Sequence, residues 1–413
     1  MIRWIAMAAG CTGQAADGTD DPSDSLGITT TDGGSGGTGG TGGAGGSGGT
    51  GGSGGTGGTG GSGGTGGTGG AGGTGGTTAP ARIFDDEHVL VLPDADGLAF
   101  MDRAGTLVGR IEMEVIEPVC NNCTGEGASA DGDGLLFCWA KGFNGGGIAR
   151  IDPDATVAWK INGLAFPHGA VRDPYDDTVA VPQAGDNDVA WFEGDGSSEV
   201  PVRRLSDGDP GWSQDLANGI EKFEKDGRVY FIISNRGEGD GPNPGKLTAW
   251  DVTDPDAPSL LWKFPAGDDG LAAPHGAVVR EYGGQLWLLY AHSYGAPSED
   301  EGTIGLAVTD DITVLPTYVA DLQPEDETAP LDFPRGIELT EDGELWITDS
   351  GPEFAFGGPS GRVLLATMPA DLVPSALTGA VDDQNFVGIE AELILDEIDN
   401  PFHGWLWFPT FSF

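Results

Sequence analysis

The sequence is poor in basic residues, in histidine and in long apolar runs. Of its 413 residues only 19 are Lys or Arg, against 65 Asp and Glu, so the formal net charge is −46. A surface of this charge repels nucleic acid, and the chain has no basic patch or run that would overcome the repulsion. We therefore expect no nucleic-acid partner. One explanation of the acidic excess is solubility. The alternative is that Asp-rich loops, such as DVTDPDAP at 251–258, bind divalent cations, but no loop has the EF-hand pattern, so we favour solubility.

No apolar run approaches the length of a transmembrane helix. The first eleven residues, MIRWIAMAAGC, combine Arg3, a short apolar run and a small-residue box that ends at Cys11. This pattern resembles the signal of bacterial lipoproteins, in which such a cysteine becomes the lipidated N-terminus. The resemblance implies a signal segment over 1–11 and a cell-envelope protein that touches a membrane through its lipid anchor only. The alternative is an ordinary N-terminus that contains one cysteine.

Residues that could join a core are missing from a long glycine tract. From Gly33 to about Thr78 the sequence continues in the manner of GGSGGTGGTGGAGG. Such a composition cannot bury enough apolar surface to offset the entropy lost on ordering. We expect a disordered linker over 12–80 and one folded domain over 81–413.

Cysteine is scarce as well. After Cys11 the chain contains only Cys120, Cys123 and Cys138. An exported protein meets oxidising conditions, so we expect one disulfide among these three residues and one remaining thiol. The pairing stays open. A zinc site here would need a fourth ligand, and no histidine lies nearby in the sequence.

The chain also contains a repeat, in which nearly the same nine residues occur three times. The copies are LAFPHGAVR at 164–172, LAAPHGAVV at 271–279 and LDFPRGIEL at 331–339. Weaker copies lie at 125–142 and 218–237, and a stub closes the chain at 402–410. In the strong copies a Pro-X-Gly motif precedes a turn, a β-rich run that often holds Trp, and a Gly-containing loop. We call the X position the slot; it is occupied, in chain order, by Glu126, His168, Asn218, His275, Arg335 and His403.

The slots recur at intervals of about 40–70 residues, and repeats of this length made of short strands are typical of β-propellers. Runs such as RVYFII and QLWLLY have strand composition, and EKDG and EYGG have hairpin-turn composition. The sequence therefore predicts an all-β, six-bladed propeller. Residues 87–115 would supply three strands of the first blade, and 402–413 would close the ring by joining it. A seventh blade would require a degenerate unit within 376–400.

Two families share this repeat texture. PRGIELTEDGELW (334–346) resembles the repeat of streptogramin lyases and related NHL-type propellers. AWKINGLAFPH (158–168) and LLWKFPAGDDGLAAPH (260–275) resemble the Trp-containing strands that precede His-bearing entry strands in bacterial arylsulfate sulfotransferases, which are exported six-bladed propellers. The first resemblance implies a histidine base near a divalent metal, and the second implies sulfuryl transfer.

In a propeller, each blade's first strand begins on the face where its second strand ends. The slot residues should therefore ring one mouth of the central channel. The second-strand ends add Lys141, Gln183, Arg236, His292 and Asp349. The chain has five His, and four of them fall on this predicted face. Imidazole and cationic groups gathered at one mouth of an acidic protein suit an anionic group such as a sulfate ester or a carboxylate.

We predict catalytic roles for His168, His275, Arg335 and His292. We predict ligand-binding roles for Glu126, Asn218, Arg236, Lys141, His403 and Asp349. The sulfotransferase resemblance implies His275 or His168 as nucleophile and Arg335 as the clamp on the sulfate oxygens. The lyase resemblance implies His275 as general base, with Glu126 or Asp349. A third arrangement places His168, His275 and a carboxylate around zinc or calcium.

A purely structural explanation competes with these, because Pro fixes the strand entry, Gly allows the turn and a polar slot residue solvates the channel. Two functional hypotheses follow. One is an enzyme that acts on a small anionic or ester-containing molecule. The other is a non-catalytic propeller that binds a glycan, a peptide or a protein. A divalent metal (calcium, magnesium or zinc) is the cofactor to test, and we expect a monomer. The recurrent Trp residues should pack between blades.

Overall fold

The computed structural model describes residues 90–398, apart from several internal segments. These segments are 95, 103, 121–122, 142–144, 207–208, 210–211, 213–215, 238–243, 267–269, 272, 293–301, 326–329, 341–342, 351–360 and 369–385. The predicted signal segment with Cys11, the linker at 12–80 and the C-terminal stub with His403 therefore lie outside the described residues.

The described chain is almost entirely β-strand, with one short helix, α1 (Met113–Ile116). The strands of the first three sheets are β1 (Leu90–Asp94), β2 (Gly97–Met101), β3 (Leu107–Glu112), β4 (Thr124–Asp131), β5 (Gly134–Ala140), β6 (Gly146–Ile151), β7 (Val157–Asn162), β8 (Val171–Arg172), β9 (Thr178–Gln183), β10 (Asp188–Glu193) and β11 (Arg203–Leu205). Those of the last three are β12 (Ala217–Lys225), β13 (Arg228–Gly237), β14 (Pro244–Asp251), β15 (Ser259–Phe264), β16 (Pro274–Tyr282), β17 (Gln285–His292), β18 (Thr303–Thr309), β19 (Thr317–Pro324), β20 (Pro334–Leu339), β21 (Glu344–Asp349), β22 (Gly361–Thr367), β23 (Phe386–Ile389) and β24 (Ala391–Ile398).

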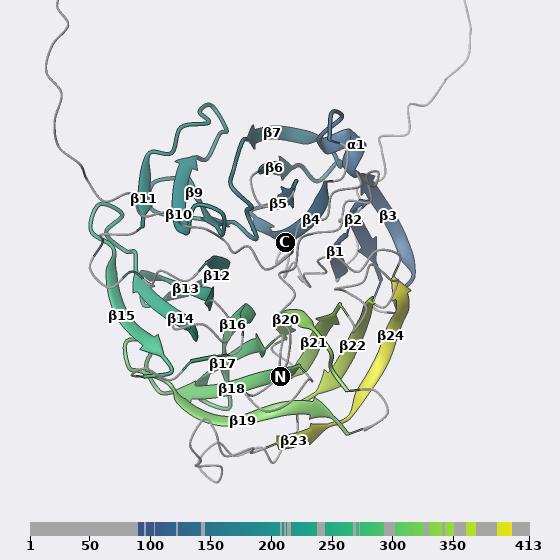
Figure 1. The fold of residues 1–413 in the computed structure, drawn as a ribbon, viewed down its shortest axis with the longest axis vertical. Coiled ribbons are helices and arrows are strands. Elements are labelled where there is room, and N and C mark those ends of the chain that lie inside the picture. Colours follow the sequence, from purple (N-terminus) through teal and green to yellow (C-terminus); the bar gives the residue numbers. More distant parts are fainter. Residues whose placement is uncertain are drawn as a thin grey trace, which may run out of the picture. The chain divides into compact units, whose positions relative to one another are not determined.

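These strands form six sheets arranged around a common axis as a six-bladed β-propeller, which confirms the predicted fold (Figure 1). Each blade is an antiparallel meander whose first strand is one edge of its sheet: β1, β4, β8, β12, β16 and β20. Those of the six that Figure 1 labels lie nearest the axis. Residues 386–398 do not form a seventh blade. Instead β24 is the outer strand of the sixth blade, and β23 pairs in parallel with β19 at the edge of the fifth. The predicted closure by residues 402–413 lies outside the described residues.

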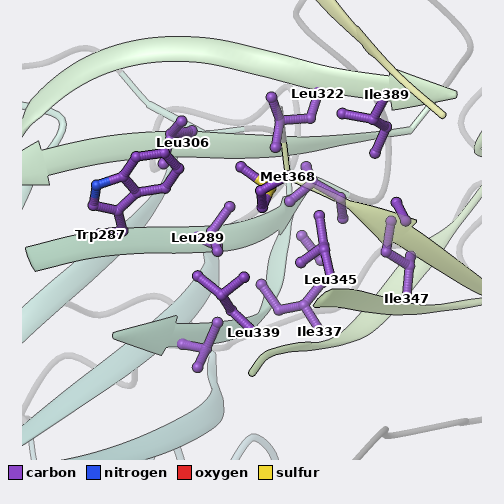
Figure 2. Close-up of a cluster of buried hydrophobic side chains, with 14 of the residues drawn as sticks. Trp287, Leu289, Leu306, Leu322, Ile337, Leu339, Leu345, Ile347, Met368 and Ile389 are labelled. Carbon is purple, nitrogen blue, oxygen red and sulfur yellow. The ribbon is translucent and has the colours of Figure 1, made fainter. Parts of the chain in front are cut away.

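The core lies between the faces of neighbouring blades, so most strands are buried on both sides. Figure 2 shows this packing between the fifth and sixth blades, where Leu289 of β17 lies near Ile337 of β20 and Leu345 of β21. Because both faces are covered, β17 is a nearly continuous apolar run rather than an alternating one. Four tryptophans are among the largest buried side chains, as expected for blade packing: Trp139, Trp191, Trp250 and Trp346.

A glycine of one blade and the slot-motif proline of the next touch at three blade interfaces. A Cβ on Gly146, Gly245 or Gly302 would lie 2.2–2.6 Å from the Cδ of the following blade's proline, which is Pro167, Pro274 or Pro334 respectively. Contacts this short leave no room for a side chain. The repeated Gly-containing loop and the repeated Pro are therefore two halves of one blade-to-blade contact.

Ion pairs also join the inner strands of neighbouring blades, a few residues beyond the slots. Arg280 of β16 reaches Glu221 of β12 at 2.6 Å and Glu338 of β20 at 2.6 Å, so one guanidinium connects three blades. Burial raises the pKa of Glu338 to about 7, although Arg280 opposes the shift. Folding therefore favours the protonated form of this carboxyl.

We predict that Gly245→Ala destabilises the propeller by about 1–3 kcal/mol, because the new Cβ overlaps Pro274 and two backbone carbonyl oxygens. Gly169→Ala is the control. A Cβ there would sit 3.6 Å from its nearest neighbour, in ordinary contact with Ile220, so stability should change by less than about 1 kcal/mol. Chemical denaturation of both variants measures the difference. Equal effects would show that the glycine–proline contact is not what excludes the side chain.

We also predict that Glu338 makes stability fall with rising pH. Its pKa is about 7 in the folded protein against a reference of 4.5, so the folded state binds the proton more tightly. The resulting stabilisation is fully present below pH 4.5 and is lost as the pH rises through 7, by about 3 kcal/mol in total. The free energy of unfolding of Glu338→Gln, measured beside the wild type from pH 4 to 8, should lack this part of the decline. A difference between the two proteins that does not vary with pH would contradict the assignment.

Candidate functional site

Slot residues sit in β-bulges at the start of the inner strands. In β4 the register with β5 passes from Gly125 directly to Gly127, so Glu126 has no residue opposite it. The same jump occurs around Asn218 in β12 and around Arg335 in β20, and in β16 it spans His275 and Gly276. His168 lies in the third blade between the Pro167–Gln183 bridge and the β8–β9 ladder. A bulge bends the strand and re-aims a side chain, which is how the repeat presents a variable residue to the axis.

The backbone two residues before the slot is strained in three blades. Phe166, Leu216 and Ala273 have φ values of 54°, 24° and 43°, in the left-handed region that non-glycine residues rarely adopt. Each precedes a slot residue by two positions: His168, Asn218 and His275. Such strain persists only where surrounding structure imposes it, and it tends to mark functional sites.

The five described slot residues are all buried, and four of them meet in pairs from neighbouring blades. Each is at most 2% exposed. His168 Nδ1 lies 3.3 Å from Glu126 Oε2, and Thr124 donates a 2.8 Å hydrogen bond to the other oxygen of this carboxyl. Asn218 Nδ2 and His275 Nδ1 are 2.6 Å apart. With the amide nitrogen donating to Nδ1, the imidazole proton lies on Nε2.

Arg335 links these pairs electrostatically. Burial and the positive charges of Arg335 and Arg236 hold the pKa values of His168 and His275 well below the usual range. Burial raises the pKa of Glu126 well above its usual range, although the charge of Arg335 opposes that shift. Both histidines are therefore neutral imidazoles near pH 7. We call Glu126, His168, Asn218, His275 and Arg335 the axial cluster.

Two phenylalanines complete the surroundings of the axial cluster. The Phe166 ring packs edge-on against His168 with centroids 4.2 Å apart. The Phe333 ring lies 5.4 Å from the His275 ring and 4.7 Å from the guanidinium carbon of Arg335. Our sequence analysis overlooked these residues and Thr124. The signal for the phenylalanines was present, because FPH and FPR each place Phe two positions before the slot.

The ends of the second strands support the slot segments rather than extend the cluster. Gln183 accepts a hydrogen bond from the backbone N–H of Ala165, three residues before His168. Asp349 accepts from the backbone N–H groups of Asp332 and Phe333, just before Arg335, and also pairs with Arg362 at 2.7 Å. These contacts give Asp349 a positioning role in the structure. The ligand-binding role predicted for it remains a prediction.

The remaining predicted site residues are dispersed. Arg236 is half-buried, and its charge lowers the pKa of both axial histidines. Lys141 is exposed, at the end of β5. His292 is buried at the end of β17, where the charge that acts on it comes from Asp321 rather than from Arg335. The structure thus brings together three of the four predicted catalytic residues and places the fourth in a different environment.

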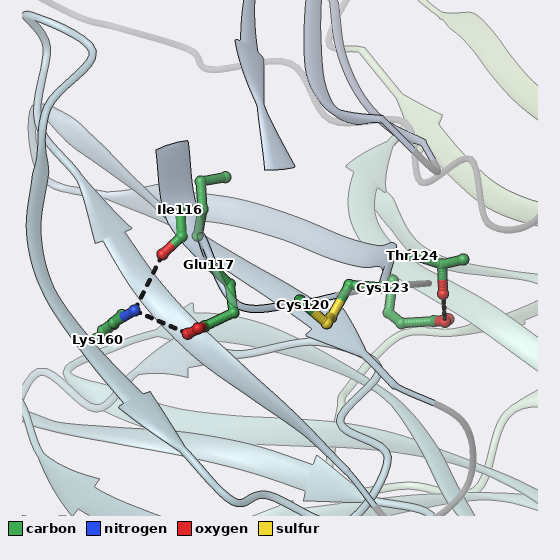
Figure 3. Close-up of a disulfide and its surroundings, with 7 residues drawn as sticks. Ile116, Glu117, Cys120, Cys123, Thr124 and Lys160 are labelled. Carbon is green, nitrogen blue, oxygen red and sulfur yellow. Dashed lines mark hydrogen bonds and ion pairs between the residues drawn. A yellow bond between two sulfur atoms is a disulfide. The ribbon is translucent and has the colours of Figure 1, made fainter. Parts of the chain in front are cut away.

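The three described cysteines form one disulfide and leave one thiol. Cys120 and Cys123 are joined, with Cα atoms 5.6 Å apart, and Cys138 is a free buried thiol whose pKa burial raises. Figure 3 shows the disulfide between the segment that holds Glu117, which pairs with Lys160 at 2.7 Å, and Thr124 at the start of β4. The disulfide therefore closes the segment that leads into the strand of Glu126.

Within the described parts of the chain, no group of three or more His, Cys, Asp or Glu side chains is placed to hold a metal ion. The predicted arrangement of His168, His275 and a carboxylate around one ion is thus not formed as a three-ligand centre there. Among the same residues, no helix is long and apolar enough to cross a membrane.

No protein-family model matches the chain, and no curated protein matches it. The solved structures similar to it include the nidogen/laminin complex (TM-score 0.45, 12% identity, over 74% of this chain and 98% of that chain). They also include the Swd1 β-propeller domain of Myceliophteria thermophila (TM-score 0.37, 14% identity, over 65% of this chain and 70% of that chain) and the Dos1 propeller (TM-score 0.39, 12% identity, over 67% of this chain and 65% of that chain). These similarities concern fold alone.

We predict that Asn218→Asp raises the pKa of His275 by at least about 1, because a carboxylate beside Nδ1 favours the imidazolium. Asn218→Ala removes the contact without adding charge and should produce no such rise. NMR titration of the histidine ring protons, assigned with His275→Gln, measures both. Identical titration of His275 in all three proteins would mean that the contact with Asn218 does not persist in solution.

Proposed function

We propose that this propeller is an enzyme that acts on a small anionic ester at the axial cluster, with transfer or cleavage of the anionic group. The observation that carries the proposal is the meeting of two neutral imidazoles with Arg335, each from a different blade and each set in or beside a strand irregularity. An arginine binds the oxygens of a sulfate or carboxylate, and a neutral imidazole can accept a proton from an attacking hydroxyl.

The residues divide the chemistry between them. Arg335 would hold the anionic oxygens, and His275 would donate from Nε2, which has no hydrogen-bond partner among the described residues. His168, whose Nδ1 lies 3.3 Å from Glu126 Oε2, would act as the base. In sulfuryl transfer to a phenol, the acceptor hydroxyl gives its proton to His168 as its oxygen bonds to sulfur. The ester S–O bond breaks, and His168 returns the proton to the departing phenolate.

The proposal extends to location. A lipid on Cys11 would anchor the protein in the cell envelope, and the glycine-rich segment would separate the propeller from the membrane surface. Small extracellular or periplasmic esters would then be its substrates. The competing function is a non-catalytic propeller that captures an anionic group of a glycan, peptide or protein with the same residues.

The test is turnover of a nitrophenyl sulfate by the full chain, with phenol as acceptor and with or without a chelator. We expect His168→Ala to lower kcat by about 10²–10⁴-fold, and Arg335→Met to raise KM as well as lower kcat. Lys225→Ala, which removes an exposed positive charge from the far end of β12, is the control and should leave turnover unchanged. Binding of the ester without turnover, lost in Arg335→Met, would favour the capture function. Neither binding nor turnover would overturn the proposal for sulfate esters.

A further inference from the structure

The structure contains a second set of buried polar groups, separate from the axial cluster, on one face of the fifth blade. His292 and Tyr290 lie two residues apart in β17 and so point to the same face. Thr303 lies opposite His292, and Asp321 lies across Gly305 from Tyr290. Each of these four polar residues is at most 4% exposed. We call His292, Tyr290, Thr303 and Asp321 the fifth-blade cluster.

Glycine brings two members of this cluster toward each other. A Cβ on Gly305 would lie 2.6 Å from the Tyr290 hydroxyl oxygen, so the absence of a side chain allows this hydroxyl to extend over Gly305, the residue paired with Asp321. The Tyr290 and His292 rings are 4.8 Å apart. Burial and the negative charge of Asp321 raise the pKa of Tyr290, and the same charge opposes the lowering of the His292 pKa by burial. The charge of Asp321 thus acts on both Tyr290 and His292.

Several polar atoms of this cluster have no protein partner among the described residues. They are both ring nitrogens of His292, the Tyr290 hydroxyl, the Thr303 hydroxyl and Asp321 Oδ1. Buried polar groups in proteins are almost always satisfied, and several orphans on one face point to a bound group that satisfies them together.

Charge decides the class of that group. The described residues include no Lys or Arg that pairs with Asp321, whose other oxygen accepts a 2.8 Å hydrogen bond from the neutral Tyr318 hydroxyl. The surroundings are apolar, with Phe264 and Leu271 in the same buried cluster as Tyr290. A buried carboxylate in such a place is normally paired with a cation or coordinates a metal.

We propose that the fifth-blade cluster binds a divalent transition-metal ion such as Zn²⁺ through Asp321 and the neutral imidazole of His292. One imidazole nitrogen and one carboxylate oxygen are ligands that zinc accepts, whereas calcium takes six to eight oxygens. The Tyr290 and Thr303 hydroxyls would bond to the ion or to water on it. With two strong protein ligands, the ion would keep coordination positions open. This proposal does not depend on the function of the axial cluster.

The experiment uses the full chain, stripped with a chelator, and Zn²⁺ and Co²⁺ as probes in a millimolar excess of Ca²⁺ that saturates the acidic surface. We expect one tightly bound Zn²⁺ per chain, a rise in the thermal midpoint on binding, and a Co²⁺ absorption band from nitrogen and oxygen ligands. Asp321→Asn and His292→Gln should each weaken binding by at least about 10-fold and abolish the thermal shift.

His168→Gln and Cys138→Ser are the controls. Each removes a buried side chain of a type that can bind zinc but lies outside the fifth-blade cluster, so Zn²⁺ binding should be unchanged. Asp321→Asn has nearly the shape of the wild type. Without metal it should be at least as stable as the stripped wild type, because it no longer buries an uncompensated charge. Absence of tight Zn²⁺ binding to the wild type, or binding that survives in both Asp321→Asn and His292→Gln, would overturn the proposal.

Discussion

The β-bulge at the start of the inner strands is the constraint from which the arrangement of the axial cluster follows. A regular strand alternates its side chains, and its inner edge would present only backbone to the axis. The register jumps at Glu126, Asn218 and Arg335 free one residue per blade from the ladder. Where a proline precedes the slot residue, as before His275 and Arg335, a glycine of the preceding blade touches that proline, so these two bulges are positioned by the contact between blades. Blade packing and the placement of the variable residue are therefore one device.

Burial then determines what the gathered residues can do. In water, the same histidines would be partly protonated near neutral pH. Within the axial cluster, desolvation and the charge of Arg335 keep them neutral, and desolvation disfavours charge on Glu126. The site thus combines one strong cation with groups that can give or take a proton. That combination distinguishes the axial cluster from the part of the inner strands beyond the slots, where Arg280 lies between two carboxyl groups.

Sequence periodicity was sufficient for the fold and for the slots, because each blade repeats the same local solution. Pro-X-Gly marks the start of the inner strand in three blades, and an apolar run that often holds Trp marks the buried second strand. Side-chain direction at the ends of the second strands was not predictable in this way. His292, Asp349 and Lys141 occupy similar positions in the repeat, yet one is buried against Tyr290, one holds the Arg335 segment and one is exposed. What each contacts depends on the loop beside it, and the loops do not repeat. The disulfide pairing had the same limit, because three nearby cysteines allow more than one geometry.

The axial and fifth-blade clusters share one structural element. Pro274 pairs with His292 across the β16–β17 ladder, and the next residue in β16 is the slot residue His275. The bulge that presents His275 therefore rests on the residue that we propose as a metal ligand. An ion on His292 and Asp321 would tie the ends of β17 and β19 together, and so would stiffen the strand against which the bulge is formed. On this view the two clusters bind distinct ligands but share the β16–β17 strand pair. Any coupling between them would pass through the Pro274–His292 pair. His292 would then affect the axial chemistry as a positioning residue, without touching the substrate.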